Sequence, residues 1–298
     1  GVYMSVYIHG GLRSPIGVLN GQYKHMRPEI LGSQVIDEII NRYTISHIDG
    51  IFCGNAVGTG GNLGRLMGLM CNLPNSVPAI TVDMQCASAL MSIEIAYAHI
   101  LSGIMDSAIA GGIESSSLQP ERVYASGDDR EGPYKVAQFT PQDQSPLAML
   151  KGAERTIHKY NVTKEDLYPH IIGSHQRASA ALDNPYLQSY IMPITIDGKR
   201  CIDECIRPTM NEKLLSRMKP LLGADSITNA GNACLTHDGA AFVYLSNKKG
   251  PFKIHSVKPW AGNPQFSPEG ALESTEGILK RTGLTMDDID VVEWNEAF

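Results

Sequence analysis

Cys86 stands where a thiol is well placed to act as a nucleophile. It follows a strand predicted at Ala79–Met84 and opens a helix predicted at Cys86–Leu101. The N-terminus of a helix carries partial positive charge and free N–H groups, which stabilise the thiolate that attacks carbonyl carbon. The alternative is a buried cysteine that packs as a small apolar side chain, which is the commoner role of an arbitrary cysteine. Position alone therefore leaves both interpretations open.

Glycine pairs and a cysteine pair offer further candidate sites, each with a simpler explanation. Gly111-Gly112 would allow close backbone approach near the candidate nucleophile, and a tight turn would explain the pair equally well. It does not form a dinucleotide fingerprint, and Gly58–Gly61 lacks the Lys-Ser or Lys-Thr ending of a phosphate-binding loop. Cys201 and Cys205 have no second Cys/His pair at matching spacing, so we expect two independent thiols and no metal site.

Short β-rich runs alternate with helical segments around these residues. The predicted strands are Ser5–His9, Ile48–Cys53, Ala79–Met84 and Ser107–Ala110. Apolar residues at helical spacing predict helices at Glu29–Tyr43, Asn62–Cys71 and Cys86–Leu101. The alternation is typical of an α/β layered fold with a largely parallel core sheet. The third helix is apolar almost all round, so we expect it to be buried in the core.

The middle of the chain has a different composition from the first third. Between Leu118 and Ser226, Pro, Asp, Gln, Arg and Tyr are frequent, and a helix at Ser145–Tyr160 appears without alternating strands. This pattern indicates a long insertion or lid. The apolar run Asp238–Leu245 then predicts a strand that returns to the sheet.

The end of the chain repeats the pattern of its beginning. Pro28-Glu29, a helix and a strand recur as Pro268-Glu269, a helix and a strand that ends at Asn295. A strand predicted at Lys253–Val257 precedes the second set. We therefore expect a second copy of the first half's fold.

The composition is that of an ordinary globular protein, with 298 residues, 43% of them hydrophobic and 19% charged. A net charge of -6 and a pI near 5.8 argue against nucleic acid as a partner. No apolar run approaches the roughly 20 residues of a membrane span, so we expect no membrane association and a cytoplasmic location. The six cysteines do not form a disulfide-dense pattern, and we expect free thiols.

The residues around Cys86 read VDMQCASAL (Val82–Leu90), which resembles the nucleophile motif of the thiolase family. Other segments resemble thiolase landmarks in the family's order: RSPIG (Arg13–Gly17), GNAVGTGGNLGR (Gly54–Arg65), AGGIESSS (Ala110–Ser117), KGAE (Lys151–Glu154), RPT (Arg207–Thr209), KP (Lys219-Pro220), NAGNACLTHDGAA (Asn229–Ala241) and NEAF (Asn295–Phe298). Each match is weak by itself, whereas the ordered set is specific. The resemblance covers essentially the whole chain.

The resemblance implies a role for each matching residue. Cys86 would take the acyl group from an acyl-CoA, and its backbone N–H would help to stabilise the tetrahedral intermediate. Asn295 would hold a water that stabilises the enolate-like oxygen of the second thioester, although by itself it fits a strand-end turn. The residues that match contacts with CoA or its pantetheine arm are Met149, Arg207, Ala230, Cys234, Ala297 and Phe298. Core packing would also explain Met149 and Phe298, and a solvated charge would explain Arg207.

Several features depart from the family pattern. In the family, a His in a Gly-His-Pro context and a Cys in a Cys-x-Gly context follow NEAF, and neither is among these 298 residues. Because the His activates the nucleophile and the Cys is the general base, we expect these residues alone to be nearly inactive. Cys234 replaces a serine that hydrogen-bonds pantetheine, and a thiol bonds more weakly. Leu235 adds bulk in place of a glycine, and Ala148 stands where some members place a histidine.

The resemblance implies a layered α-β-α-β-α fold built from two similar halves, the second incomplete in this sequence. Residues 1–117 would form the N-terminal half, to which a strand at 238–247 returns. Residues 118–237 would form a loop or lid domain for CoA binding, and residues 248–298 the start of the C-terminal half. Thiolases pair near the nucleophile, so the resemblance implies a homodimer or homotetramer.

The implied function is that of an acetyl-CoA C-acyltransferase. It would condense acyl-CoA units or thiolyse a 3-ketoacyl-CoA through a Cys86 thioester, in fatty acid or isoprenoid precursor metabolism. Acyl-CoA would be the substrate, with no cofactor and no metal. A ketosynthase is a second enzyme hypothesis, but it would show a His motif where NEAF stands. From a different class, the alternative is an inactive thiolase-like scaffold or subunit.

Overall fold

The computed structural model describes residues 4–298, which divide into two compact units. The first, here called the sheet unit, comprises residues 4–120, 182–205 and 236–257, and the second, the helical unit, comprises 121–181, 206–235 and 258–298. Residues 182–205, which the sequence analysis assigned to the lid, thus belong to the sheet unit. Within residues 4–298, no helix combines the length and apolar character needed to cross a membrane.

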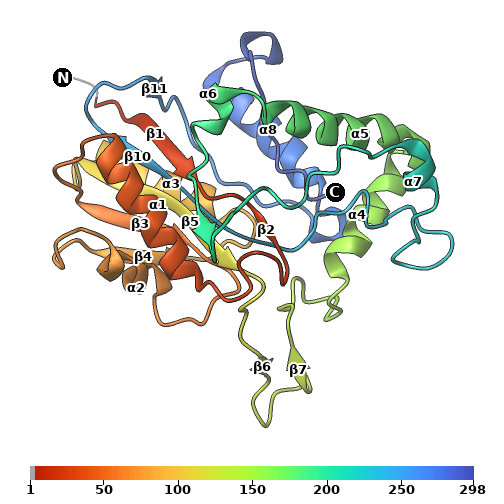
Figure 1. The fold of residues 1–298 in the computed structure, drawn as a ribbon. Coiled ribbons are helices and arrows are strands. Elements are labelled where there is room, and N and C mark those ends of the chain that lie inside the picture. Colours follow the sequence, from red (N-terminus) through yellow and green to blue (C-terminus); the bar gives the residue numbers. More distant parts are fainter. Residues whose placement is uncertain (1–3) are drawn as a thin grey trace. The chain divides into compact units, whose positions relative to one another are not determined.

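A seven-stranded mixed sheet forms the centre of the sheet unit (Figure 1), in the order β11-β1-β10-β5-β3-β4, with β2 paired to β10. β5, β3 and β4 are parallel to one another, and β10 is antiparallel to both β5 and β1. The predicted α/β class is therefore confirmed, but the sheet is less parallel than expected because β10 runs against its neighbours. The strands are β1 (Tyr7–Arg13), β2 (Gly17–Val18), β3 (Gly50–Gly54), β4 (Ala79–Val82), β5 (Ser107–Ser115), β10 (His237–Ser246) and β11 (Phe252–Lys253).

Helices cover both faces of this sheet (Figure 1). Alternate residues of a strand point to opposite faces. Ile51 and Cys53 of β3 accordingly belong to the core cluster that includes α1 (Pro28–Arg42) and α2 (Leu63–Met70). Phe52, between them, belongs to the cluster of α3 (Ser88–Leu101). All five residues of β3 are buried, as expected for a parallel strand covered on both faces.

Burial of α3 is one-sided, which corrects the expectation of a fully buried helix. Its buried residues are Ser88, Ser92, Ala96 and Ile100, at the four-residue spacing of a single helix face. Leu90, off this face, is 72% exposed. The helix buries the face that meets the sheet. Its opposite face is apolar as well, but no other element within the described residues covers it.

The same sheet unit contains three short elements from residues 182–205: α6 (Pro185–Gln188), β8 (Thr195–Ile196) and β9 (Lys199–Arg200). The helical unit contains α4 (Ala148–Lys159), α5 (Lys164–Ala181), α7 (Glu212–Ser216), α8 (Glu269–Thr282) and a hairpin of β6 (Arg122–Val123) and β7 (Pro133–Tyr134). Glu269 joins the first and last of these helices by accepting hydrogen bonds from Lys159 Nζ at 2.6 Å and Tyr160 Oη at 2.7 Å.

The predicted second copy is only partly present. The predicted helix is present as α8. In place of the strand predicted at Lys253–Val257, the structure has only the two-residue β11, which pairs with β1 at the edge of the first sheet. Residues 289–295 form no strand. A strand forms only against a partner backbone, and the described residues place none beside this segment. The expectation of a second set of strands is therefore wrong for this part of the chain.

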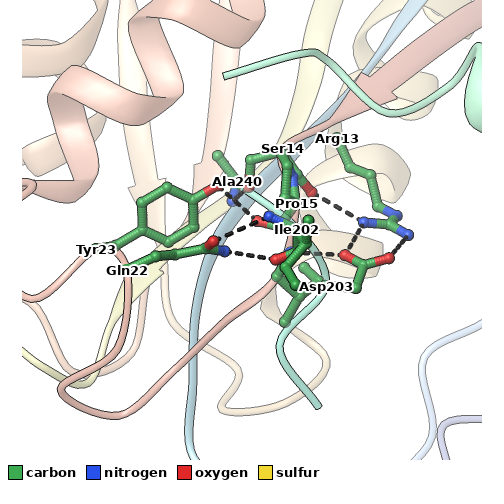
Figure 2. Close-up of polar contacts among 9 residues, drawn as sticks. Arg13, Ser14, Pro15, Gln22, Tyr23, Ile202, Asp203 and Ala240 are labelled. Carbon is green, nitrogen blue, oxygen red and sulfur yellow. Dashed lines mark hydrogen bonds and ion pairs between the residues drawn. The ribbon is translucent and has the colours of Figure 1, made fainter. Parts of the chain in front are cut away.

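Ile202 and Asp203 bind the segment from Arg13 to Gln22, which begins at the last residue of β1 (Figure 2). The Asp203 carboxylate accepts two hydrogen bonds from the Arg13 guanidinium, at 2.8 and 2.9 Å, and one from the Ile16 backbone N–H at 2.8 Å. Gln22 and Ile202 exchange two side-chain-to-backbone bonds of 2.7 and 3.0 Å. Burial raises the pKa of Asp203, but the bonds from Arg13 and Ile16 outweigh it, so the pKa lies below its ordinary value.

We expect Asp203→Asn to lower the free energy of unfolding by about 1–3 kcal/mol, because a charged acceptor of three hydrogen bonds is lost. Urea denaturation followed by circular dichroism measures the change. The depressed pKa means that the difference from wild type is present above the unfolded-state value of 3.8 and is lost as pH falls through the folded-state pKa.

The matched control is Asp197→Asn, an exposed carboxylate at a left-handed turn position with φ 49° that asparagine also tolerates. It should change stability by less than about 0.5 kcal/mol. If Asp203→Asn were as stable as this control, the hydrogen bonds that Asp203 accepts from Arg13 and Ile16 would not contribute to stability as proposed.

Candidate active site

Cys86 lies in a sharp turn between β4 and α3, as the sequence predicts, although the helix begins at Ser88 and not at Cys86. Cys86 is exposed. Gln85, just before it, adopts a left-handed backbone with φ 51°, which is uncommon for a residue other than glycine. The Ser88 hydroxyl holds this turn: it accepts from the Met84 N–H at 2.8 Å and donates to the Gln85 carbonyl at 2.6 Å. A strained strand-to-helix turn that presents a nucleophile is a recurring catalytic device.

Two glycines of the sheet allow close approach of the elbow, which we define as residues 84–88, or of Ala89, which follows it. A Cβ atom on Gly54 would lie 2.7 Å from the Ser88 carbonyl carbon and 2.8 Å from the Ala89 nitrogen. A Cβ on Gly112 would lie 3.0 Å from the Gly54 oxygen and 3.4 Å from the Ala89 Cβ. Gly112 lies inside β5, so close approach near the nucleophile, and not a tight turn, explains it.

Glu114 fixes the loop that follows β3, a function that the sequence analysis did not identify. Its carboxylate accepts from Asn55 Nδ2 at 2.8 Å, the Ala56 N–H at 2.9 Å and the Val57 N–H at 3.3 Å. Burial raises the pKa of Glu114 in spite of these bonds. The signal in the sequence was a charged residue at the end of an otherwise apolar and small strand, AGGIES.

Accessibility separates Cys86 from most of the other cysteines. Within residues 4–298 none of the six forms a disulfide, and of the six Cys86 and Cys234 are exposed. Burial raises the pKa of both Cys53 and Cys71 to about 12, so these thiols stay protonated at neutral pH. Buried, protonated thiols do not act as nucleophiles. From Met4 to Phe298, no three His, Cys, Asp or Glu side chains gather in a way that could hold a metal ion.

Asn295 belongs to the helical unit. Hydrogen bonds hold the residues on either side of Asn295. Trp294 donates from Nε1 to Thr275 Oγ1 of α8 at 3.1 Å. The Ala297 carbonyl accepts from the Cys234 N–H at 2.8 Å. Asn295 itself is exposed between these two anchors. The structure thus brings Cys234 and Ala297 together, as two of the predicted CoA-contacting residues.

Glu154 of α4 secures the loop that carries Ala230 and Cys234. Its carboxylate accepts from the Ile227 N–H at 2.8 Å and from the Thr228 N–H at 3.0 Å, and it also accepts from the Thr228 hydroxyl. Burial raises the pKa of Glu154, but these bonds outweigh it and the pKa lies below its ordinary value. In the sequence, Glu154 is the last residue of the KGAE motif, which by itself assigns it no function.

The remaining predicted CoA-contacting residues also lie in the helical unit. Met149 is partly buried in the first turn of α4, and Ala230 is exposed. Phe298 lines an apolar pocket of about 190 Å³ beside α4. Arg207 is exposed, and its backbone N–H donates to His175 Nδ1 of α5 at 3.0 Å. Cys86 is the one predicted site residue in the sheet unit.

Two neighbouring departures can also be located. Ala148 is buried as the first residue of α4, so its methyl group packs inward. Leu235 is exposed and directly follows the exposed Cys234. The expected narrowing of the pantetheine tunnel by Leu235 stays a prediction.

Comparisons with known proteins identify the family of the chain. The family model described as "Thiolase, N-terminal domain" matches residues 6–249. A Staphylococcus epidermidis protein provisionally named acetyl-CoA C-acetyltransferase VraB is 32% identical over 306 residues, which cover 96% of this chain and 78% of the relative. Its Staphylococcus aureus counterpart is 31% identical, over 96% of this chain and 79% of its own length.

Solved structures extend the likeness to the fold. Bacillus anthracis acetyl-CoA acetyltransferase superposes with a TM-score of 0.90 at 24% identity, covering 99% of this chain and 81% of its own. Human mitochondrial 3-ketoacyl-CoA thiolase, solved in complex with CoA, also gives 0.90, at 25% identity, covering 100% of this chain and 80% of its own. With its family match, its relatives and its fold in agreement, the chain belongs to the thiolase family of acyltransferases.

Proposed function

We propose that Cys86 is the nucleophile through which this thiolase-type acyltransferase transfers acyl groups between CoA thioesters. The observation that carries the proposal is the elbow: an exposed thiol at a strained turn directly before a helix, in close contact with Gly54 of the sheet. The buried cysteines do not offer this combination. The CoA-bound human relative and the acetyltransferase relatives support acyl-CoA as the class of substrate.

The chemistry follows from a thiolate at this position. Its sulfur attacks the thioester carbonyl of an acyl-CoA, the C–O double bond becomes an oxyanion, and collapse expels CoA as a thiolate and leaves an acyl-Cys86 thioester. The backbone N–H of Cys86 would stabilise the oxyanion. Condensation or thiolysis then depends on whether an enolate-like acyl-CoA or CoA itself takes the acyl group. Asn295, held between Trp294 and Ala297, would position the water that stabilises the enolate-like oxygen.

For CoA itself, we propose a binding surface on the helical unit. Met149, Arg207, Ala230, Cys234, Ala297 and Phe298 all lie in this unit, and one hydrogen bond joins Cys234 to Ala297. Residues 118–237 would then supply most of the CoA contacts, with residues 1–117 and 238–247 carrying the nucleophile and residues 248–298 carrying Asn295. CoA acts here as a substrate, and the proposal requires no further cofactor or metal.

We further propose that the protein is a homodimer or homotetramer in a reducing compartment such as the cytoplasm. β4 lies at one end of the sheet order, so its outer backbone edge is available for pairing within the described part of the chain. Exposed apolar side chains lie on β4 and on the neighbouring helices α2 and α3: Ile80, Leu66, Leu69 and Leu90. Six cysteines without a disulfide in the described part of the chain fit a compartment that keeps thiols reduced.

Incubation with acetyl-CoA should add one acetyl group to the wild-type protein and none to Cys86→Ala, because the acyl group forms a thioester with this sulfur. Acylation requires a single turnover, so prolonged incubation should reveal it even in these 298 residues alone, where activation of the thiol is weak. Mass spectrometry of the intact protein, followed by peptide mapping, measures the addition. Cys205→Ser is the control and should acetylate like wild type. An adduct that persists in Cys86→Ala would overturn the assignment, and no adduct in either protein would favour the inactive scaffold.

Glu154→Gln should weaken CoA binding by about tenfold, because the amide cannot replace a carboxylate that accepts three hydrogen bonds from residues 227 and 228. Isothermal titration with CoA measures the dissociation constant. Glu165→Gln, an exposed residue in the first turn of α5, is the matched control and should bind as wild type does. Equal affinities in the two variants would mean that Glu154 does not position the CoA surface.

Light scattering coupled to size exclusion should report a mass two or four times that of one chain, because pairing through β4 satisfies its open edge and covers the neighbouring apolar side chains. Dilution over a hundredfold range tests whether the assembly persists. A mass equal to a single chain at every concentration would rule out the proposed oligomer.

A further inference from the structure

His175 of α5 makes a contact that the proposed function does not use. Its Nδ1 accepts a hydrogen bond from the backbone N–H of Arg207 at 3.0 Å. Arg207 begins a turn that is closed by the bond from the Met210 N–H to the Arg207 carbonyl at 3.1 Å. The imidazole therefore fixes the backbone at the start of the loop that carries the Arg207 guanidinium. The contact joins residues 32 positions apart in the sequence.

This hydrogen bond defines the protonation state of His175. An imidazole nitrogen that accepts an N–H bond has no proton of its own, so Nε2 carries the single proton of a neutral ring. Partial burial, followed by the nearby positive charge of Arg207, lowers the pKa of His175. The neutral, accepting form is thus the form that the surroundings favour at neutral pH.

Protonation would convert this contact from attractive to repulsive. An imidazolium carries a proton on both nitrogens and cannot accept from the Arg207 N–H. It would also add a positive charge beside the Arg207 guanidinium. The other acidic, basic and histidine groups on the elements around it are Lys164, Glu165, Asp166, His170 and Arg177 on α5, and Glu212 and Lys213 on α7, which packs against α5. Among all these groups, Arg207 is the one whose charge lowers the pKa of His175.

We propose that His175 is a positioning residue for CoA recognition, which holds Arg207 in place when its ring is neutral and releases it when the ring is protonated. The inference rests on the proposed function in one respect, the assignment of Arg207 to the CoA surface. It predicts that CoA affinity falls as pH decreases through the pKa of His175, below the ordinary histidine value of about 6.5.

The test compares four proteins by isothermal titration with CoA at about pH 7.5, where the ring of His175 is neutral, and at about pH 5. They are the wild type, His175→Asn, His175→Ala and Arg207→Ala. The asparagine oxygen is bonded to Cγ as Nδ1 is, so it can accept the same bond without titrating. Alanine favours helices more than histidine does, so a loss of affinity in His175→Ala cannot arise from weakening α5.

At the higher pH, His175→Asn should bind CoA within about twofold of wild type, and His175→Ala about 3- to 10-fold more weakly, as expected for loss of one hydrogen bond. At the lower pH, wild type should lose about 3- to 10-fold more affinity than His175→Asn does. His175→Asn also corrects for the titration of the CoA phosphate monoester itself, which has a pKa of about 6.

The outcomes separate the inference from the proposal on which it rests. If Arg207→Ala binds CoA like wild type at both pH values, Arg207 is not a CoA contact and both ideas fail. If Arg207→Ala binds weakly, but His175→Ala matches wild type or His175→Asn keeps the full pH dependence, the role of His175 alone is overturned. Circular dichroism at both pH values confirms that each variant is folded.

Discussion

The approach of α3 to the sheet is the constraint on which the site depends. The first turn of this helix lies so close to Gly54 that a methyl group there would meet backbone atoms of Ser88 and Ala89 at 2.7–2.8 Å, well inside normal contact. Any larger residue would push the helix away from the sheet and move Cys86 with it. The position of Cys86 therefore depends on three features together. They are the glycine on β3, the hydrogen bonds of the Ser88 hydroxyl to the turn, and the left-handed backbone of Gln85.

Carboxylates that accept backbone N–H groups stabilise the loops around this arrangement. Glu114 and Glu154 each bind two consecutive N–H groups, of residues 56 and 57 and of residues 227 and 228. Burying a carboxylate costs free energy unless hydrogen bonds offset it. The balance differs between the two, since burial leaves the pKa of Glu114 raised, whereas the pKa of Glu154 is lowered. Hydrogen bonds thus offset the cost of burying the carboxylate more fully at Glu154 than at Glu114.

Local patterns predicted what local forces determine. The spacing of apolar residues identified α1, and the strand-to-helix junction at Cys86 followed from composition. The exposed side of α3 and the place of β11 could not be predicted, because they depend on which neighbours are present. The positioning roles of Glu114, Glu154 and His175 could not be predicted for a related reason. Their hydrogen-bond partners lie 58, 73 and 32 residues away, and no local sequence pattern indicates such a contact.

The two parts of the proposed site achieve their geometry by different means. Cys86 is placed by a strand and a helix in close contact, which tolerate little displacement. The proposed CoA contacts lie mainly on loops, whose positions are fixed by single side chains such as Glu154 and His175. Changing such a side chain would alter recognition of CoA without disturbing the nucleophile. Where the acceptor is a histidine and not a carboxylate, the proposed contact gives the position of the loop a dependence on pH below the ordinary histidine pKa of about 6.5, whereas a carboxylate stays charged until the pH is more acidic.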